Sequence, residues 1–284
     1  MMRRLLRMSA LLATSAMALA AVGIQPAAAI TGGQPDGEAH PNVALILAYD
    51  EDGSRYRCSA TLIEPTVLLT AAHCTDPAVG STLVTFDTVV AETPPLPLPV
   101  AADPSAGYTD EEITAAGFFA GTALTHPEYS DFTDTDNWND VGVIVLDEPV
   151  VGIEPAVVAP LRYLDRFASP VLNRTLFEVV GYGTEVRKPA TGPQKPQPMS
   201  YPLIRRSTTS PGQKLTPQIL QLQGNPNDNR GGGGTCFGDS GGPVFLDGYL
   251  VAVTSYGYTS NCRYLGGYQR VEIPVVQEWL AATL

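Results

Sequence analysis

Histidine and cysteine are scarce in this chain, with three histidines and four cysteines among 284 residues. No two cysteines are spaced as Cys-x-x-Cys, which argues against a zinc site built from cysteines, and we expect neither a metal nor a cofactor. Chemistry that needs an imidazole can use only His40, His73 or His126. All three precede Ser240, the serine considered below, so a catalytic triad that uses this serine must have its histidine earlier in the chain.

Long apolar segments and basic residues are also few. Beyond residue 29, no stretch is long and apolar enough to span a membrane as a helix. Lys and Arg together number 17 against 29 Asp and Glu, which gives a net charge of −12. An acidic surface argues against nucleic acid and against an anionic membrane, so we expect neither as a partner.

Residues 1–29 predict a secretory signal peptide that is not part of the fold. Arginines open the segment, an apolar run follows at 11–21, and alanines at 27–29 suit signal peptidase. Because the segment holds three arginines and no acid, its removal changes the net charge from −12 to −15. We therefore expect a secreted protein, whose cysteines pair in an oxidising compartment. Sequence alone leaves their connectivity open.

The segment 238–243, Gly-Asp-Ser-Gly-Gly-Pro, holds a serine in a setting that favours reactivity. The glycines beside Ser240 allow a tight turn and let backbone N–H groups point at a developing oxyanion. Such a serine needs a histidine and an orienting carboxylate. The segment also fits the Gly-x-Ser-x-Gly elbow of α/β-hydrolases, but that fold orders its triad as Ser, acid, His. No histidine follows Ser240, so this class is excluded.

His73 has the setting that best fits the missing base. It follows the apolar run 67–72, which predicts a buried strand, and Cys74 comes directly after it. A structural core histidine is the alternative interpretation. His126 lies in a polar turn and His40 precedes a proline, so both are expected at the surface.

Asp140 is the candidate for the carboxylate. It stands directly before the apolar run 141–146, where its side chain can be buried against an imidazole N–H and fix the tautomer of the ring. The alternative is a turn residue that opens a strand.

These three motifs, in the order His73, Asp140, Ser240, resemble the trypsin/chymotrypsin family of serine endopeptidases. The resemblance runs from about residue 30 to the C-terminus. It implies that His73 is the general base and then the acid, that Asp140 orients it, and that Ser240 is the nucleophile. The backbone N–H groups of Gly238 and Ser240 would form the oxyanion hole.

The resemblance also implies two disulfides and an activating ion pair. It selects Cys58–Cys74 beside the histidine and Cys236–Cys262 beside the serine. In the family, a free amino terminus pairs with the acid before the nucleophile, which here would join Ile30 to Asp239. Because Ile30 directly follows the alanines at 27–29, signal cleavage after Ala29 could itself create that terminus.

The family binds the P1 side chain of its substrate in a pocket. Its base lies six positions before the serine, at Gly234, where no carboxylate stands, so a strong preference for Arg or Lys is not expected. The expected walls are Ser255, Tyr256, Gly257 and Gly266. An open, uncharged slot suits a large apolar or aromatic P1 side chain, although turn geometry alone could also explain the glycines.

The fold class expected is all-β, with two packed antiparallel β-barrels and a C-terminal α-helix. Short apolar runs separated by Gly and Pro predict strands, and only 274–280, with proline in its first turn, predicts a helix. The strand runs are 42–49, 67–70, 141–146, 176–183, 243–253 and 268–273. The N-terminal barrel, with His73 and Asp140, is assigned to 30–150, a connection to 151–170, and the C-terminal barrel and helix, with Ser240, to 171–284.

The sequence therefore predicts a secreted serine endopeptidase that forms an acyl-enzyme on Ser240 and prefers P1 residues other than Arg and Lys. The expected state is a monomer, and the expected partners are polypeptide substrates and a protein inhibitor. Two other functions stay open: a catalytically silent binding module on the same fold, and an esterase.

Overall fold

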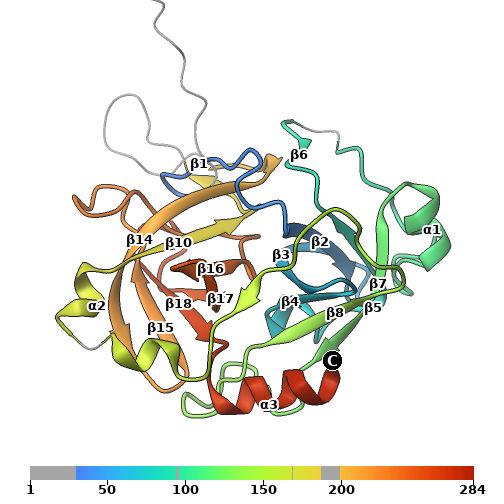
Figure 1. Cartoon of the computed structure of the whole chain (residues 1–284). Helices are drawn as coiled ribbons and strands as arrows, with labels where there is room; N and C mark the ends of the chain where they lie inside the picture. Colours follow the sequence, from blue (N-terminus) through green and yellow to red (C-terminus); the bar gives the residue numbers. More distant parts are fainter. Residues whose placement is uncertain (1–29, 94–95, 168, 187–198) are drawn as a thin grey trace, which may run out of the picture.

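The computed structural model describes residues 30–93, 96–167, 169–186 and 199–284. The predicted signal peptide lies outside the described residues. Figure 1 shows two β-barrels side by side, with the C-terminal helix α3 (Pro274–Thr283) below them in this view. The expected all-β class, the two antiparallel barrels and the terminal helix are confirmed.

The first barrel closes from six antiparallel strands. In barrel order they are β2 (Val43–Tyr49), β3 (Arg55–Glu64), β4 (Val67–Thr70), β8 (Gly142–Leu146), β7 (Phe119–Thr125) and β5 (Val79–Thr85). Side chains alternate along β2 because a strand has a period of two. Ala44 and Ile46 join an apolar cluster made only of this barrel, whereas Leu45 and Leu47 join one shared with the second barrel and α3.

The second barrel also has six antiparallel strands. They are β14 (Arg206–Leu215), β10 (Leu176–Gly181), β16 (Pro243–Leu246), β17 (Tyr249–Gly257), β18 (Leu265–Arg270) and β15 (Ile219–Gln223). The barrel closes where β14 pairs with β15. The run 243–253, predicted from its apolar residues, holds two strands joined at a turn, because Asp247 and Gly248 both have positive φ.

Short strands tie the two halves of the chain together. β1 (Gln34–Pro35) pairs with β14, β9 (Val157–Val158) pairs with β17, and β6 (Val89–Ala91) pairs with β13 (Leu203–Ile204). A separate pair joins β11 (Glu185–Val186) to β12 (Met199–Ser200). The first residues of β1 thus lie on the second barrel, although they precede the first barrel in sequence.

The expectation that only the C-terminus is helical was wrong. The described chain also contains α1 (Asp110–Ala115), α2 (Val171–Arg174), η1 (Ala72–Cys74) and η2 (Tyr163–Arg166). Helix α1 begins with a capping box, in which Thr109 and Glu112 satisfy each other's backbone N–H groups. That Thr-x-x-Glu signal is visible in the sequence. Among the described helices, none is long and apolar enough to cross a membrane.

The expected surface positions of two histidines are also corrected. His126 is only 3% exposed, because its ring lies 4.9 Å from that of Trp279 in α3 and its Nδ1 accepts the Glu128 N–H. His40 is partly buried, with its Nδ1 2.7 Å from Asp36 and its ring stacked on Phe245. Each ring packs against a segment distant in sequence, which local polarity could not reveal.

Candidate active site

Strand pairing brings His73 and Asp140 to the same end of the first barrel. Strands β4 and β8 are antiparallel, with Thr70 opposite Gly142. His73 follows the end of β4 on the short helix η1, and Asp140 precedes the start of β8. The imidazole Nδ1 lies 2.9 Å from one carboxylate oxygen of Asp140 and 3.1 Å from the other.

The Asp140 carboxylate is fully buried and surrounded by donors. Its Oδ1 accepts the backbone N–H of His73 at 2.9 Å, and its Oδ2 accepts the hydroxyl of Ser255 at 2.6 Å. Ser255 in turn accepts the indole N–H of Trp138 at 3.0 Å. An ionised carboxylate can only accept, so Nδ1 of His73 carries its proton and Nε2 keeps a free lone pair.

The loop that carries Ser240 is held against the first barrel. Ser59 of β3 donates its backbone N–H to the Ser240 carbonyl at 2.8 Å and its hydroxyl to the Gly238 carbonyl at 3.0 Å. Gly241 has φ +73°, and a Cβ there would lie 1.9 Å from Oγ1 of Thr70. The loop therefore needs glycine at 241, and that glycine touches the strand that leads to His73.

Asp239 is fully buried in the second barrel. It accepts N–H groups from Gly183 at 2.7 Å and Cys236 at 2.8 Å. Burial nevertheless raises the pKa of this carboxyl to about 7, against the opposing effects of the two N–H groups and of the Arg57 charge. Among the described residues, no salt bridge joins Asp239 to a cation, and the N–H groups that it accepts are neutral.

This pKa predicts how stability depends on pH. The folded full-length chain holds a proton on Asp239 that the unfolded chain has lost above about pH 4. We therefore expect the free energy of unfolding to lose a contribution as pH rises from about 4 to 7. Urea denaturation of the full-length chain and of Asp239→Asn across this range measures it. The stability of the wild-type chain relative to that of Asp239→Asn should fall as pH rises, because asparagine does not titrate, and a constant difference would contradict the assignment.

Ile30 lies close to this region in the uncut chain. Its side chain is fully buried in the apolar cluster of the second barrel, which includes Tyr268. Thr31 exchanges two backbone hydrogen bonds with Gly234, at 2.9 and 3.1 Å. Ile30 has φ +52°, a conformation that a β-branched residue rarely adopts. Its nitrogen is here a peptide nitrogen and carries no charge.

A cavity of about 380 Å³ opens beside Ser240. Four of the five predicted pocket residues line it, namely Ser255, Tyr256, Gly257 and Gly266, together with Gly224, Thr235, Cys236, Phe237, Thr254, Thr259, Ser260, Cys262, Tyr264, Leu265 and Tyr268. None of these lining residues is charged. Gly234 is not among them, because the position of its Cβ points at Gly224, 2.5 Å from the Cα. Instead, the hydroxyls of Thr235 and Tyr268 face each other at 3.0 Å.

A row of aromatic rings leads from His73 to this cavity. The ring centroids of His73 and Phe132 are 5.6 Å apart, those of Phe132 and Trp138 5.2 Å, and those of Trp138 and Tyr256 5.2 Å. Phe132 is 40% exposed. The row forms a partly exposed apolar surface beside the cavity.

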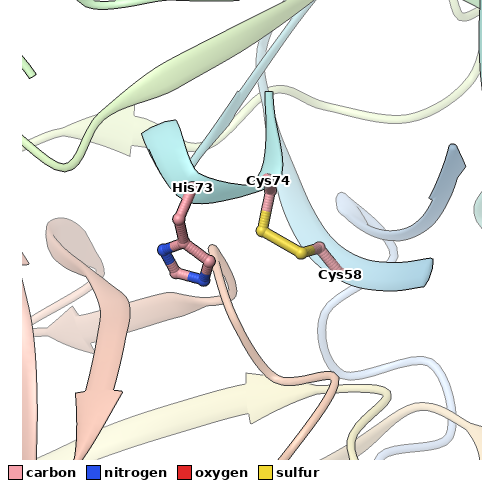
Figure 2. Close-up of side chains that lie close together, drawn as sticks. All are labelled: Cys58, His73 and Cys74. Carbon is pink, nitrogen blue, oxygen red and sulfur yellow. A yellow bond between two sulfur atoms is a disulfide. The ribbon is translucent and has the colours of Figure 1, made fainter. Parts of the chain in front are cut away.

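Both disulfides expected from the resemblance are confirmed. Cys58–Cys74 and Cys236–Cys262 each fix a segment next to a predicted catalytic residue. Figure 2 shows the imidazole of His73 and the disulfide leaving η1 in different directions. The sulfurs of Cys58 and Cys74 lie within 4.8 Å of a His73 ring nitrogen, but they are bonded to each other and so are not thiolate ligands.

Sequence reasoning missed two residues at this site, Trp138 and Ser59, and one role of a third, Ser255. Trp138 supports Ser255, which was predicted only as a pocket wall, and Ser59 holds the serine loop. A tryptophan in the otherwise polar run 133–140 was a usable signal. Ser59 gave none, because its contact joins strands that are far apart in the chain.

The chain is similar to known proteins over most of its length. Residues 30–280 match the family model described as Trypsin. The chain is 30% identical over 222 residues to a trypsin of Saccharopolyspora erythraea, covering 77% of this chain and 82% of that protein. It is 29% identical over 217 residues to the thrombin-like enzyme elegaxobin-1 of Protobothrops elegans, covering 75% and 78%.

Two solved structures share the fold at low identity. HL collagenase superposes with a TM-score of 0.59 and 19% identity, covering 90% of this chain and 95% of that chain. Human heparin binding protein superposes with a TM-score of 0.55 and 17% identity, covering 89% and 96%. Because the family model spans most of the sequence, the chain belongs to the trypsin family.

Proposed function

We propose that this protein is a secreted serine endopeptidase that hydrolyses peptide bonds through an acyl-enzyme on Ser240. The observation that carries the proposal is the buried Asp140 carboxylate, bound at 2.9 Å to Nδ1 of His73. A carboxylate is costly to bury, and this one accepts N–H and O–H groups on both oxygens. Such an arrangement fixes the imidazole in the tautomer that a general base requires.

The proposed reaction uses the chain's own groups throughout. Nε2 of His73 takes the proton of Ser240 as the hydroxyl attacks the scissile carbonyl, and the backbone N–H groups of Gly238 and Ser240 stabilise the oxyanion. His73 then gives the proton to the leaving amine, which frees the second half of the substrate. Water, deprotonated by the same imidazole, attacks the ester on Ser240, the acid leaves, and His73 returns the proton to the Ser240 oxygen.

Activation is proposed to follow cleavage before Ile30. The new ammonium would pair with Asp239, a buried carboxyl that has no salt bridge to any residue the structure describes. The φ of +52° at Ile30 supports this step, because cleavage removes the preceding carbonyl and with it the strain. Signal peptidase acting after Ala29 would make this cut during export. N-terminal sequencing of the active secreted protein tests this step, and a start at any residue other than Ile30 contradicts it.

The cavity supports a P1 side chain that is large and apolar or aromatic. Its lining carries no charge, and the hydroxyl pair of Thr235 and Tyr268 can accept or donate to a polar tip. The row of rings from Phe132 to Tyr256 would contact the residues that precede P1. The substrates proposed are therefore polypeptides, cleaved by a monomer that a protein inhibitor could block.

Gly257→Val is expected to lower kcat/KM for a substrate with Phe at P1 about tenfold or more, and to change it little for Ala at P1. A Cβ at Gly257 would meet only the Thr259 carbonyl, at 3.9 Å, so the variant can fold with its branched side chain extending into open space beside the cavity. A panel of peptides that differ only at P1 measures the ratio. Equal losses for Phe and Ala would contradict this position for the P1 side chain.

Labelling by an organophosphonate tests the proposed function directly. We expect one equivalent of label on Ser240, found by peptide mass mapping, and none in Ser240→Ala. An unlabelled wild-type protein that starts at Ile30 would favour a silent binding module instead. Hydrolysis of esters without hydrolysis of peptides by the labelled protein would favour an esterase.

A further inference from the structure

Arg57 of β3 is a cation beside the proposed oxyanion hole. Its side chain is half-buried, and no hydrogen bond or ion pair joins it to the part of the chain that the structure describes. A Cβ added to Gly238 would lie 2.7 Å from its Nε and 3.4 Å from its Cδ, so the side chain covers that glycine. Ser59, two residues along the same strand, faces the same way and donates to the Gly238 carbonyl.

The charge on Arg57 is incompletely compensated. Burial lowers the pKa of its guanidinium, and the two groups that oppose this effect, the carboxyl of Asp239 and the hydroxyl of Tyr201, do not cancel it. Asp239 is already engaged by the N–H groups of Gly183 and Cys236. The segment 187–198 contains no Asp or Glu in its sequence, so it supplies no carboxylate. A half-buried cation in this state favours an anion that arrives from outside.

Arg57 lies beside Gly238 of the serine loop but outside the cavity proposed for the P1 side chain. The cavity proposed for the P1 side chain is lined by Ser240 but not by Arg57. Arg57 precedes Cys58, whose disulfide joins it to Cys74, the residue after His73. His73 delivers the proton to the leaving amine, so the departing chain begins beside the imidazole. The departing chain and the oxyanion are bound to the same carbon, so a guanidinium that covers Gly238 is within reach of the first residues after the bond.

We propose that Arg57 binds a carboxylate of the substrate within about two residues after the scissile bond, the reach of an extended chain that advances about 3.3 Å per residue. This inference rests on the proposed peptidase function. A guanidinium can bind a carboxylate through two parallel hydrogen bonds. The preferred substrates are thus polypeptides with Asp or Glu just after the cleaved bond, or with their C-terminal carboxylate at that place.

A series of peptides that share the same residues up to the cleaved bond, and differ only after it, tests the proposal. Phe stands at P1, the C-terminus is amidated, and the two following positions carry Glu, Gln or Lys in turn. One further peptide ends two residues after the bond with a free carboxylate, which separates a chain end from a side chain. We expect kcat/KM for Glu to exceed that for Lys about tenfold, the worth of one charge-assisted hydrogen bond.

Variants assign this preference to the guanidinium. Arg57→Gln should bring the Glu-to-Lys ratio close to one, and Arg57→Glu should invert it. Arg55→Gln is the matched control, since Arg55 lies two residues away on the same strand and binds the Pro99 carbonyl, and it should keep the wild-type ratio. Organophosphonate labelling of Ser240 checks that each variant is folded.

The outcomes separate this inference from the proposed function. If the wild-type protein cleaves all the peptides without a charge preference, the proposed role of Arg57 is overturned and the proposed peptidase function is supported. A preference that persists in both Arg57 variants overturns it as well. Failure of the wild-type protein to cleave any peptide overturns both proposals together.

Discussion

Replacing Asp140 by asparagine is expected to lower kcat about 10⁴-fold while the protein stays folded. Both carboxylate oxygens accept hydrogen bonds, one from the His73 backbone and the other from Ser255, and Nδ1 of His73 lies between them. An amide group must turn its NH₂ toward one of these donors. With the NH₂ on the side of Ser255, Nδ1 becomes an acceptor and the ring proton moves to Nε2. The imidazole can then no longer take the proton of Ser240.

The measurement is single-turnover hydrolysis of a peptide with Phe at P1, together with thermal unfolding. Asp134→Asn is the matched control, because the same change of charge then falls on an exposed loop where the carboxylate accepts from Asp136 and Asn137. It should retain wild-type rates. If Asp140→Asn keeps more than about a tenth of the activity, the carboxylate does not set the tautomer and the proposed mechanism fails.

Sequence could predict the parts of the candidate site that belong to short local motifs. His73, Asp140 and Ser240 each stand at the end or start of an apolar run, and the structure places them at strand ends of the two barrels. The two disulfides followed from the resemblance to a family, since spacing alone allows several pairings.

The parts that sequence could not predict depend on contacts between distant strands. Trp138 donates to Ser255 over 117 residues, and Ser59 donates to Gly238 over 179. No periodicity or characteristic spacing in the sequence marks either pair of residues. Gly234 illustrates a different limit. The direction in which a Cβ would point at Gly234 is toward Gly224, so the next residue, Thr235, lines the cavity in its place. Register at this scale is decided by packing, not by composition.

The first barrel contacts the loop that carries Ser240, although the loop belongs to the second barrel. Strand β3 supplies Ser59 and Arg57 on one face and Cys58 on the other, so a single strand fixes the serine loop, covers Gly238 and anchors the disulfide beside His73. Relative motion of the barrels would therefore displace Ser240 and His73, the proposed nucleophile and base, together. This coupling explains why a site divided between two barrels can keep one geometry.

A protein that begins at Ile30 is expected to be about 10²–10³-fold more active than one that begins one residue earlier, at Ala29. The magnitude is that of one oxyanion-hole donor, because the ion pair would act by setting the orientation of the peptide between Phe237 and Gly238, which carries the Gly238 N–H. One extra residue moves the ammonium by about 3.8 Å, too far to pair with a carboxyl buried against Gly183 and Cys236. Rates on a peptide with Phe at P1 measure the ratio.

The same pair of proteins separates activation from simple folding. Pairing with the ammonium of Ile30 should lower the pKa of Asp239 from its value of about 7, so the loss of stability between about pH 4 and 7 should disappear in the protein that begins at Ile30. It should persist in the protein that begins at Ala29. Equal activity and equal pH profiles in the two proteins would mean that Asp239 acts only through its backbone contacts, and that the terminus at Ile30 has no part in shaping the oxyanion hole.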